Sequence, residues 1–182
     1  MTLKIAFIGK ICAGKTTASE YIMKQIPEMK KLAFADKLKE IAVDLFDMKE
    51  KNRKLLQEIG TAMRNINKDV FMNYLIKESK KYNYVCVEDG RFINEINALK
   101  KNGFILVKLN ISKKIQLERI KKTYPNTYKV HLKRLEHYSE TQMDDIDNKL
   151  FDYILNVDDI NNLFKELDFL LQKKYFKNIN EK

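Results

Sequence analysis

A glycine-rich segment near the N-terminus constrains the chain more than any other feature. Residues 9–16 are Gly-Lys-Ile-Cys-Ala-Gly-Lys-Thr and fit the pattern G-x-x-x-x-G-K-[ST] without a gap. The apolar, β-branched run at residues 3–8 predicts a buried strand before it, and residues 16–25 predict a helix that ends near Pro27. Because strand, glycine loop and helix form the context that this pattern requires, a plain turn is the weaker interpretation.

The residue types of this segment predict a phosphate-binding loop. Gly9 and Gly14 allow backbone N–H groups to point inward at an anion, and the following helix presents its positive end to the same anion. Lys15 would reach the β- and γ-phosphates of a nucleoside triphosphate, and the Thr16 hydroxyl would bind Mg²⁺. The nucleotide-binding residues expected here are Gly9, Lys10, Ala13, Gly14, Lys15, Thr16 and Thr17.

Length and composition narrow the class of protein. A chain of 182 residues with 45% hydrophobic residues suits one globular domain. No apolar run approaches the length of a membrane span, and the chain starts directly with the first predicted strand, so we expect a cytoplasmic protein without a membrane partner. Cys12 and Cys86 do not suggest a disulfide framework. Cys12 is either a small loop residue or, next to a helix N-terminus that lowers its pKa, a reactive thiol.

The net charge of +10 favours an anionic partner, either nucleotides or nucleic acid. The lysines are scattered in pairs along predicted helices, which is typical of solvated helix faces. The sequence has no zinc-finger spacing, RNA-recognition pattern or basic heptad arm. We therefore expect small-molecule nucleotides rather than nucleic acid as partners, and the sequence leaves a homodimer open.

The remaining chain predicts alternating strands and helices. Strands are expected at residues 31–35, 84–88, 104–109 and 150–156, with helices between them, so the fold class is α/β with a parallel sheet covered on both faces. Ser112 and either Asp158 or Asp159 are placed to cap helices. Roughly fifty residues of mainly helical pattern before the third strand exceed the usual crossover of about a dozen, which indicates an inserted helical lobe. Residues 121–138 are basic and rich in turn formers, which indicates a mobile cover.

Charged residues follow two predicted strands at their carboxyl ends, where open α/β sheets bind ligands. Glu88, Asp89 and Arg91 follow the third strand, and Asp36 follows the second. Asp36 has two interpretations that are compatible with each other, a helix cap and a carboxylate facing the site.

Several sequence blocks together resemble a known family. They are FADKLKE at 34–40, IGTAMR at 59–64, DVF at 69–71, EDGRFINE at 88–95, HYSE at 137–140 and DYILN at 152–156. With the phosphate-binding loop, this order resembles the deoxynucleoside monophosphate kinases of bacteriophages and related viruses, within the nucleoside monophosphate kinase group of P-loop kinases. The resemblance runs from about residue 1 to residue 171, and it places the protein in the host cytosol if the source is viral.

The resemblance implies an architecture. It predicts five parallel strands in the order 2-3-1-4-5 with flanking helices. It also predicts one kinase domain over 1–182, with a core at 1–35, 83–120 and 139–176, a substrate-binding helical lobe at 36–82 and a lid at 121–138. A glycine-rich adenine-binding pattern is absent from the sequence.

The resemblance also implies roles for individual residues. Arg64 and Arg91 would hold the phosphate of the acceptor, and Asp36 and Asp89 would lie near Mg²⁺ and the acceptor, Asp89 reaching the metal through water. Arg119, with Lys133 or Arg134, would supply the lid cations, and Gly90 would occupy a freely variable position. The implied catalytic set is Lys15, Asp36, Asp89, Arg91, Arg119 and Arg134. The implied substrate-binding set is Phe34, Asp36, Lys37, Arg64, Asp89, Arg91 and Glu95.

The activity that follows is transfer of the γ-phosphate of ATP, with Mg²⁺, to a (deoxy)nucleoside monophosphate. Phosphoryl transfer depends mainly on positioning and on cations, so His131 and His137 are not expected to be catalytic. One alternative is a small P-loop kinase with another acceptor: dephospho-coenzyme A, phosphomevalonate or a polynucleotide 5′ end. The other alternative is a nucleotide-dependent switch without turnover.

Overall fold

The computed structural model describes residues 2–136 and 138–176, with the backbone alone described at residues 134, 138 and 139. The strands are β1 Leu3–Gly9, β2 Lys30–Leu32, β3 Tyr84–Val87, β4 Ile105–Asn110 and β5 Tyr153–Asn156. The helices are α1 Lys15–Gln25, α2 Asp36–Phe46, α3 Arg53–Ile66, α4 Val70–Ser79, α5 Ile93–Lys101, α6 Lys113–Thr123, α7 Tyr128–Arg134, α8 Tyr138–Asp145 and α9 Ile160–Leu171. A 3₁₀ turn at Asn148–Leu150 and a π-helical turn at Gln172–Phe176 complete the elements.

The five strands form one parallel sheet in the order β2-β3-β1-β4-β5, which confirms the expected α/β class and strand order. Ala6 of β1 lies opposite Val87 of β3 on one side and Leu106 of β4 on the other. Because all strands run the same way, their carboxyl ends meet at one edge of the sheet. The segments that follow β1 and β3 are therefore neighbours there.

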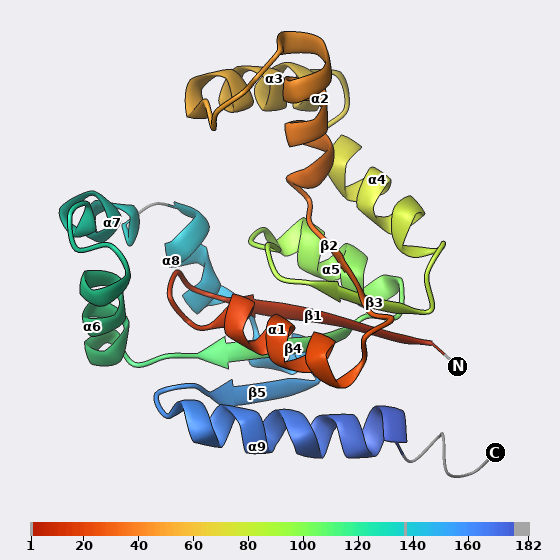
Figure 1. The fold of residues 1–182 in the computed structure, drawn as a ribbon, viewed down its shortest axis with the longest axis vertical. Coiled ribbons are helices and arrows are strands. Elements are labelled where there is room, and N and C mark those ends of the chain that lie inside the picture. The colour runs from red at the N-terminus through yellow and green to blue at the C-terminus, as the bar shows by residue number, and fades with distance from the viewer. Residues whose placement is uncertain (1, 137, 177–182) are drawn as a thin grey trace.

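The sheet is buried on both faces, which explains the continuous apolar runs of its central strands. Side chains alternate along β1, so Ile5 and Phe7 pack into one core and Ala6 and Ile8 into the other. The first core lies under α1 and α9, and the second contains residues of α4, α5 and α8. Figure 1 shows α9 along the β5 side of the sheet and α4 and α5 towards the β2 and β3 side.

Helices α2 and α3 stand away from the sheet at one end of the molecule (Figure 1). Apolar side chains on this projection are exposed, among them Leu45 of α2 and Ile66 of α3. Helices α6 and α7 lie at another corner (Figure 1). The segment predicted as a turn-rich cover contains a regular helix, α7, whose His131 is buried against the Tyr124 ring at a centroid distance of 3.8 Å.

Two predicted strands were wrong by three residues at one boundary, and the other strands differ from their predicted bounds by one residue. The second strand ends at Leu32 instead of residue 35, because the backbone amides of Phe34 and Ala35 bond to a carboxylate instead of a strand. The fifth strand begins at Tyr153 instead of residue 150, because a 3₁₀ turn precedes it. The Ser112 and Asp159 caps are confirmed by their bonds to the amides of Ile115 and Asn161. No helix of the described residues is long and apolar enough to cross a membrane.

Candidate active site

The loop between β1 and α1 folds as the sequence pattern predicts, with each glycine required for a different reason. A Cβ atom on Gly9 would lie 2.9 Å from the backbone oxygen of Leu109 on the adjacent strand β4, so only glycine fits. Gly14 precedes α1 with φ 86°, a left-handed conformation that glycine adopts at low cost. Cys12 also has a positive φ of 60°, which is uncommon for a residue with a side chain.

The Lys15 side chain closes this loop from inside. Its Nζ donates to the carbonyl oxygens of Gly9 at 2.7 Å and Lys10 at 2.9 Å. Burial, followed by the nearby Arg91 guanidinium, lowers the pKa of Lys15 to about 8, although Glu140 and Glu88 act in the opposite direction. The ammonium group is therefore held inside the loop, where water solvates its charge only weakly.

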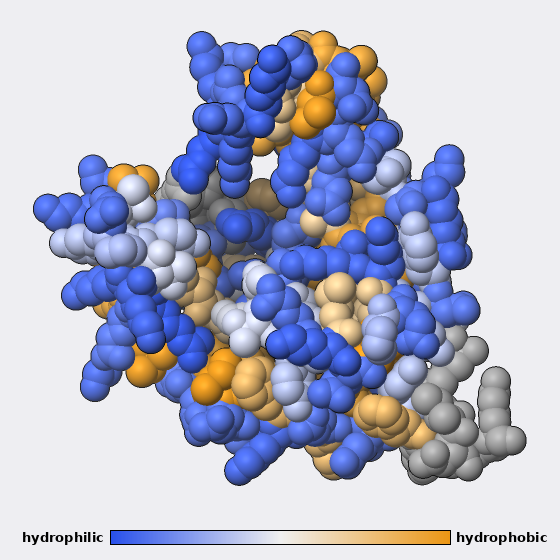
Figure 2. Space-filling view, in the orientation of Figure 1, coloured by the Kyte–Doolittle hydropathy of each residue, from blue (hydrophilic) through white to orange (hydrophobic). Residues whose placement is uncertain are grey.

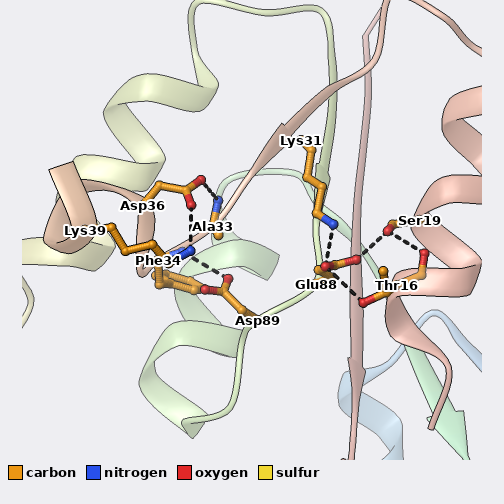
Figure 3. A network of polar contacts seen from close by, with 9 residues as sticks. All are labelled: Thr16, Ser19, Lys31, Ala33, Phe34, Asp36, Lys39, Glu88 and Asp89. Carbon is orange, nitrogen blue, oxygen red and sulfur yellow. Dashed lines mark hydrogen bonds and ion pairs between the residues drawn. The ribbon is translucent and has the colours of Figure 1, made fainter. Parts of the chain in front are cut away.

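Glu88, directly after β3, is the carboxylate that meets the start of α1 (Figure 3). Its Oε1 accepts a hydrogen bond from the Thr16 hydroxyl at 3.2 Å, and its Oε2 accepts one from Ser19. Lys31 of β2 forms an ion pair with it at 2.5 Å. Burial raises the pKa of Glu88, but the bonds from Lys31, Ser19 and Thr16 together outweigh burial, so the pKa lies below its usual value. The carboxylate is thus ionised at neutral pH.

The sequence interpretation singled out Asp89 and missed Glu88 as the partner of Thr16. The structure directs Asp89 elsewhere: its carboxylate accepts from the Phe34 amide at 3.0 Å (Figure 3) and from the Ala35 amide at 3.2 Å. Burial raises the pKa of Asp89, although these two backbone bonds lower it. A strand has side chains on alternating sides, and this alternation at the end of β3 was the signal that separates the two neighbouring acids. Asp89 as a metal ligand through water stays a prediction.

Asp36 does not cap α2, contrary to the cap expected from the sequence. The N-cap residue is Ala35, and Asp36 is the first residue of the helix. Its carboxylate turns back to accept from the Ala33 amide at 2.9 Å and pairs with Lys39 at 3.4 Å (Figure 3). Asp36 and Asp89 together therefore hold the three-residue turn between β2 and α2.

Two predicted acceptor arginines line one small cavity of about 250 Å³. The Arg64 guanidinium lies 5.0 Å from the centre of the Phe71 ring. Glu95 accepts hydrogen bonds from the amides of Arg91 at 2.9 Å and Phe92 at 3.1 Å, which fixes the start of α5. The cavity brings together Phe34, Ala35, Leu38, Arg64, Asp89, Arg91, Phe92 and Glu95. Lys37 lies outside this lining and contacts Glu40 and the Tyr74 ring.

A larger cavity of about 940 Å³ extends from the phosphate-binding loop to the β5–α9 connection. Its lining includes Lys15, Thr16 and Thr17 from the start of α1, Tyr124 after α6, and Ile160 at the start of α9. Figure 2 shows the surface hollowed between the α2–α3 projection and the α6–α7 side. Asp89 and Arg91 line both cavities, so the two spaces meet beside these residues.

The predicted lid cations differ in their environment. Arg119 of α6 donates to three backbone carbonyls, those of Cys12, Val157 and Asp158. It thereby ties the phosphate-binding loop to the segment after β5, a structural contact that the sequence did not indicate. Lys133 is exposed on α7, and the Arg134 side chain lies outside the described residues.

Glu140 of α8 is a buried acid that the sequence analysis did not place in the site. Its Oε2 accepts from the Ile11 amide of the phosphate-binding loop at 2.8 Å, and its Oε1 lies 3.3 Å from Nη1 of Arg91. The only sequence signal was its position in the HYSE block, since Ile11 and Glu140 are far apart along the chain.

The cysteines do not form an activated pair. Burial raises the pKa of the Cys12 thiol, although Lys15, Thr123 and Arg119 lower it, so the structure favours the small loop residue over the thiol of lowered pKa. Cys86 is free and buried in the core, with a raised pKa. The described residues contain no cluster of three or more His, Cys, Asp or Glu side chains that could hold a metal without a ligand's help.

No model of a protein family matches the chain, and no curated protein matches its sequence. Solved structures do match it over nearly their whole length. A shikimate kinase from Bacteroides thetaiotaomicron has TM-score 0.57 at 15% identity, covering 93% of this chain and 97% of the other. A shikimate kinase from Acinetobacter baumannii in complex with shikimate has TM-score 0.57 at 17% identity, with 96% of each chain covered.

A gluconokinase from Sinorhizobium meliloti 1021 has TM-score 0.51 at 13% identity, covering 96% of this chain and 97% of the other. Identities this low establish the fold alone. The chain therefore has the α/β fold of these small kinases, with a five-stranded parallel sheet between helices.

Proposed function

We propose that the protein transfers the γ-phosphate of ATP to a (deoxy)nucleoside monophosphate, giving ADP and the diphosphate. The observation that carries this proposal is the junction of the two cavities at Asp89 and Arg91. The larger cavity contains the phosphate-binding loop, and the smaller contains two arginines. A donor in one and a phosphorylated acceptor in the other would bring two phosphates together at a cation.

The donor occupies the larger cavity in this proposal. The amides of the loop and the start of α1 bind the β- and γ-phosphates, and Lys15 exchanges its two carbonyl partners for phosphate oxygens. Tyr124 and Ile160 line the same cavity away from the loop in sequence and would take the base, which the sequence did not place. Arg119 links two parts of the lining of this cavity through its bonds to the carbonyls of Cys12 and Asp158.

The residues at the start of α1 fit a Mg²⁺ ion. The Thr16 hydroxyl and the ionised Glu88 carboxylate lie 3.2 Å apart, and hard oxygen atoms are the ligands that Mg²⁺ prefers. With few protein ligands, such a site takes most of its other oxygens from phosphate and water. When bound, the ion neutralises charge on the phosphates. Glu88 also orients Thr16 and Ser19 towards the loop.

The acceptor occupies the smaller cavity. Arg64 and Arg91 hold its phosphate, since a planar guanidinium can bind two phosphate oxygens at once. An oxygen of this phosphate then attacks the γ-phosphorus of ATP, and the bond to the β–γ bridging oxygen breaks. A phosphate acceptor is already ionised and needs no strong general base. Phe34 and Phe92 offer ring surfaces to a base in the same cavity.

Another acceptor remains the alternative, because the structural matches are named shikimate kinase and gluconokinase. Two arginines in one small cavity favour an anionic acceptor, and the choice of a phosphate over a carboxylate rests on the family resemblance. A switch without turnover is less favoured, since it has no need for acceptor arginines beside the loop.

The test is ADP release with Mg²⁺-ATP against each common ribo- and deoxyribonucleoside monophosphate. Shikimate, gluconate, dephospho-coenzyme A, phosphomevalonate and a 5′-hydroxyl oligonucleotide are assayed in parallel. We expect turnover with one or a few monophosphates. Turnover only with another compound would overturn the acceptor, and ATP binding without any turnover would favour the switch.

A further inference from the structure

We propose that Glu140 is a positioning residue that holds Arg91 in register with the phosphate-binding loop. This inference deepens the proposed function and rests on it, because it names what sets the distance between the donor loop and the acceptor's arginine. Nothing in the family resemblance assigns a role to this glutamate.

The geometry places one carboxylate between two loops that meet only in the folded chain. Oε2 of Glu140 accepts from the Ile11 amide, which follows β1, and Oε1 contacts Arg91, which follows β3. The Glu140 side chain is only 6% exposed, whereas the Arg91 side chain is 47% exposed. Glu140 therefore fixes one terminal nitrogen of Arg91 from the protein side, and Arg91 lines both cavities.

Packing alone gives no reason for an acid at this position. Met143 and Ile146, which follow Glu140 in the chain, are buried in the apolar core on one face of the sheet. A buried carboxylate is unfavourable unless it is paired and hydrogen-bonded, and both partners of Glu140 belong to the candidate site. The acid is therefore better explained by the site than by the core.

Only a carboxylate satisfies both partners. It has two acceptor oxygens and no donor, so it can serve an N–H group and a guanidinium at once. A glutamine has one acceptor oxygen, and its NH₂ group would face either the Ile11 amide or Arg91, donor against donor. Glu140 also places a negative charge near Lys15 and Arg91, two cations that repel each other. The carboxylate thus reduces a repulsion that would push Arg91 away from the loop.

A matched control lies one turn further along α8. Asp144 also pairs with a loop residue, Lys10, at 2.6 Å, but its side chain is 67% exposed. Glu140 and Asp144 are four residues apart, so both point to the same side of the helix. Asp144→Asn makes the same chemical change as Glu140→Gln at an exposed ion pair that is expected to contribute little.

The experiment measures kcat and KM for ATP and for the monophosphate in Glu140→Gln, Arg91→Ala, the double variant and Asp144→Asn. We expect Glu140→Gln to lower kcat/KM for the acceptor about tenfold with less than about a threefold change in ATP affinity, because Arg91 loses its anchor. In the Arg91→Ala background, Glu140→Gln should lower kcat/KM for the acceptor by less than about twofold more, because Glu140 acts through Arg91. Asp144→Asn should stay within about twofold of the wild type.

The conservative variant Glu140→Asp distinguishes loss of the carboxylate from loss of folding. Glu140→Asp keeps both acceptor oxygens, so it should recover part of the loss, and it remains informative if Glu140→Gln does not fold. Equal losses from Glu140→Gln with and without Arg91 would overturn the proposal, and so would equal effects of Glu140→Gln and Asp144→Asn.

The contact of Glu140 with Ile11 can be tested even if the proposed function is wrong. If the wild type phosphorylates no monophosphate, hydrogen exchange of the Ile11 amide still tests the bridge, which is the pair of contacts from Glu140 to Ile11 and Arg91. This measurement needs no acceptor. Exchange at Ile11 should be faster in Glu140→Gln, or in Glu140→Asp if the first does not fold, and unchanged in Asp144→Asn. Unchanged exchange at Ile11 in the glutamate variant would overturn the bridge itself.

Discussion

The proposed donor and acceptor sides of the candidate site are built differently. The phosphate-binding loop is held from several directions: Glu140 bonds to the Ile11 amide, Gln116 to the Ile11 carbonyl and Arg119 to the Cys12 carbonyl. On the acceptor side, Arg64 is exposed and lies over the Phe71 ring on helices that project from the sheet (Figure 1). The loop on the donor side is fixed by partly buried hydrogen bonds, whereas Arg64 on the acceptor side is exposed to solvent.

This difference indicates where substrate choice resides. A prearranged loop binds any triphosphate in the same way, because it uses backbone groups and one lysine. An exposed arginine on projecting helices gains its geometry when the correct acceptor binds, which is the usual arrangement of induced fit. We therefore expect variants of the donor side to lose activity with every acceptor, and variants of the acceptor side to alter the choice among acceptors.

The largest effect is expected from Lys15→Ala. It removes the cation inside the loop, and loss of one charge-stabilising donor lowers kcat by about 10²–10³-fold or more. Lys24→Ala, at the exposed end of the same helix, is the control. Steady-state kinetics with saturating Mg²⁺-ATP measure both, and near wild-type turnover of Lys15→Ala would remove the donor assignment.

Variants of the neighbouring acids Glu88 and Asp89 should distinguish the two sides most clearly. Glu88→Gln weakens bonds to Thr16 and Ser19, so we expect a higher Mg²⁺ requirement and a loss of about 10–100-fold in kcat, the range of one or two charged hydrogen bonds. Asp89→Asn loosens the turn at Phe34 and Ala35, so the acceptor KM should rise while the Mg²⁺ dependence stays the same. Kinetics at varied Mg²⁺ and acceptor measure this, and a shared phenotype would abolish the division.

Arg64→Ala tests the acceptor side alone. We expect the acceptor KM to rise by about tenfold, since one exposed charged contact is lost, with ATP affinity unchanged. Arg64→Lys keeps the charge without the planar fork, so it should recover only part of the affinity. Calorimetry with ATP serves as the check, because equal loss of ATP affinity would place Arg64 on the donor side.

The smallest effect concerns the cysteines. The raised pKa of Cys12 keeps its thiol protonated at neutral pH, so alkylation by iodoacetamide should be slow and should accelerate as the pH rises towards that pKa. Bound ATP should slow it further because Cys12 lines the donor cavity. Mass spectrometry of the two sites measures the rates, with buried Cys86 as the internal control that reacts only after unfolding. Fast labelling of Cys12 at neutral pH would contradict this.

The sequence predicted the parts of the site whose geometry is local. The phosphate-binding loop is specified by adjacent residues, and the strands around it are specified by their apolar runs. Glu140 was missed because its partners, Ile11 and Arg91, become neighbours only when the sheet and α8 assemble. Glu88 and Asp89 were exchanged because the alternation of side chains at the end of β3 decides which acid faces Thr16, and the sequence interpretation did not apply it. The role predicted for Arg134 stays a prediction, because its side chain is outside the described residues.

The pairing of β1 has a consequence for how the protein folds. Leu3 lies opposite Tyr84, and Ile5 lies opposite Ile105, so the strand that carries the phosphate-binding loop has no partner until distant segments arrive. Closing such long loops makes parallel sheets intrinsically slow to form. A peptide of the first 25 residues should therefore not bind nucleotide. The binding loop is completed late in folding. Added nucleotide should therefore lower the unfolding rate and leave the folding rate unchanged.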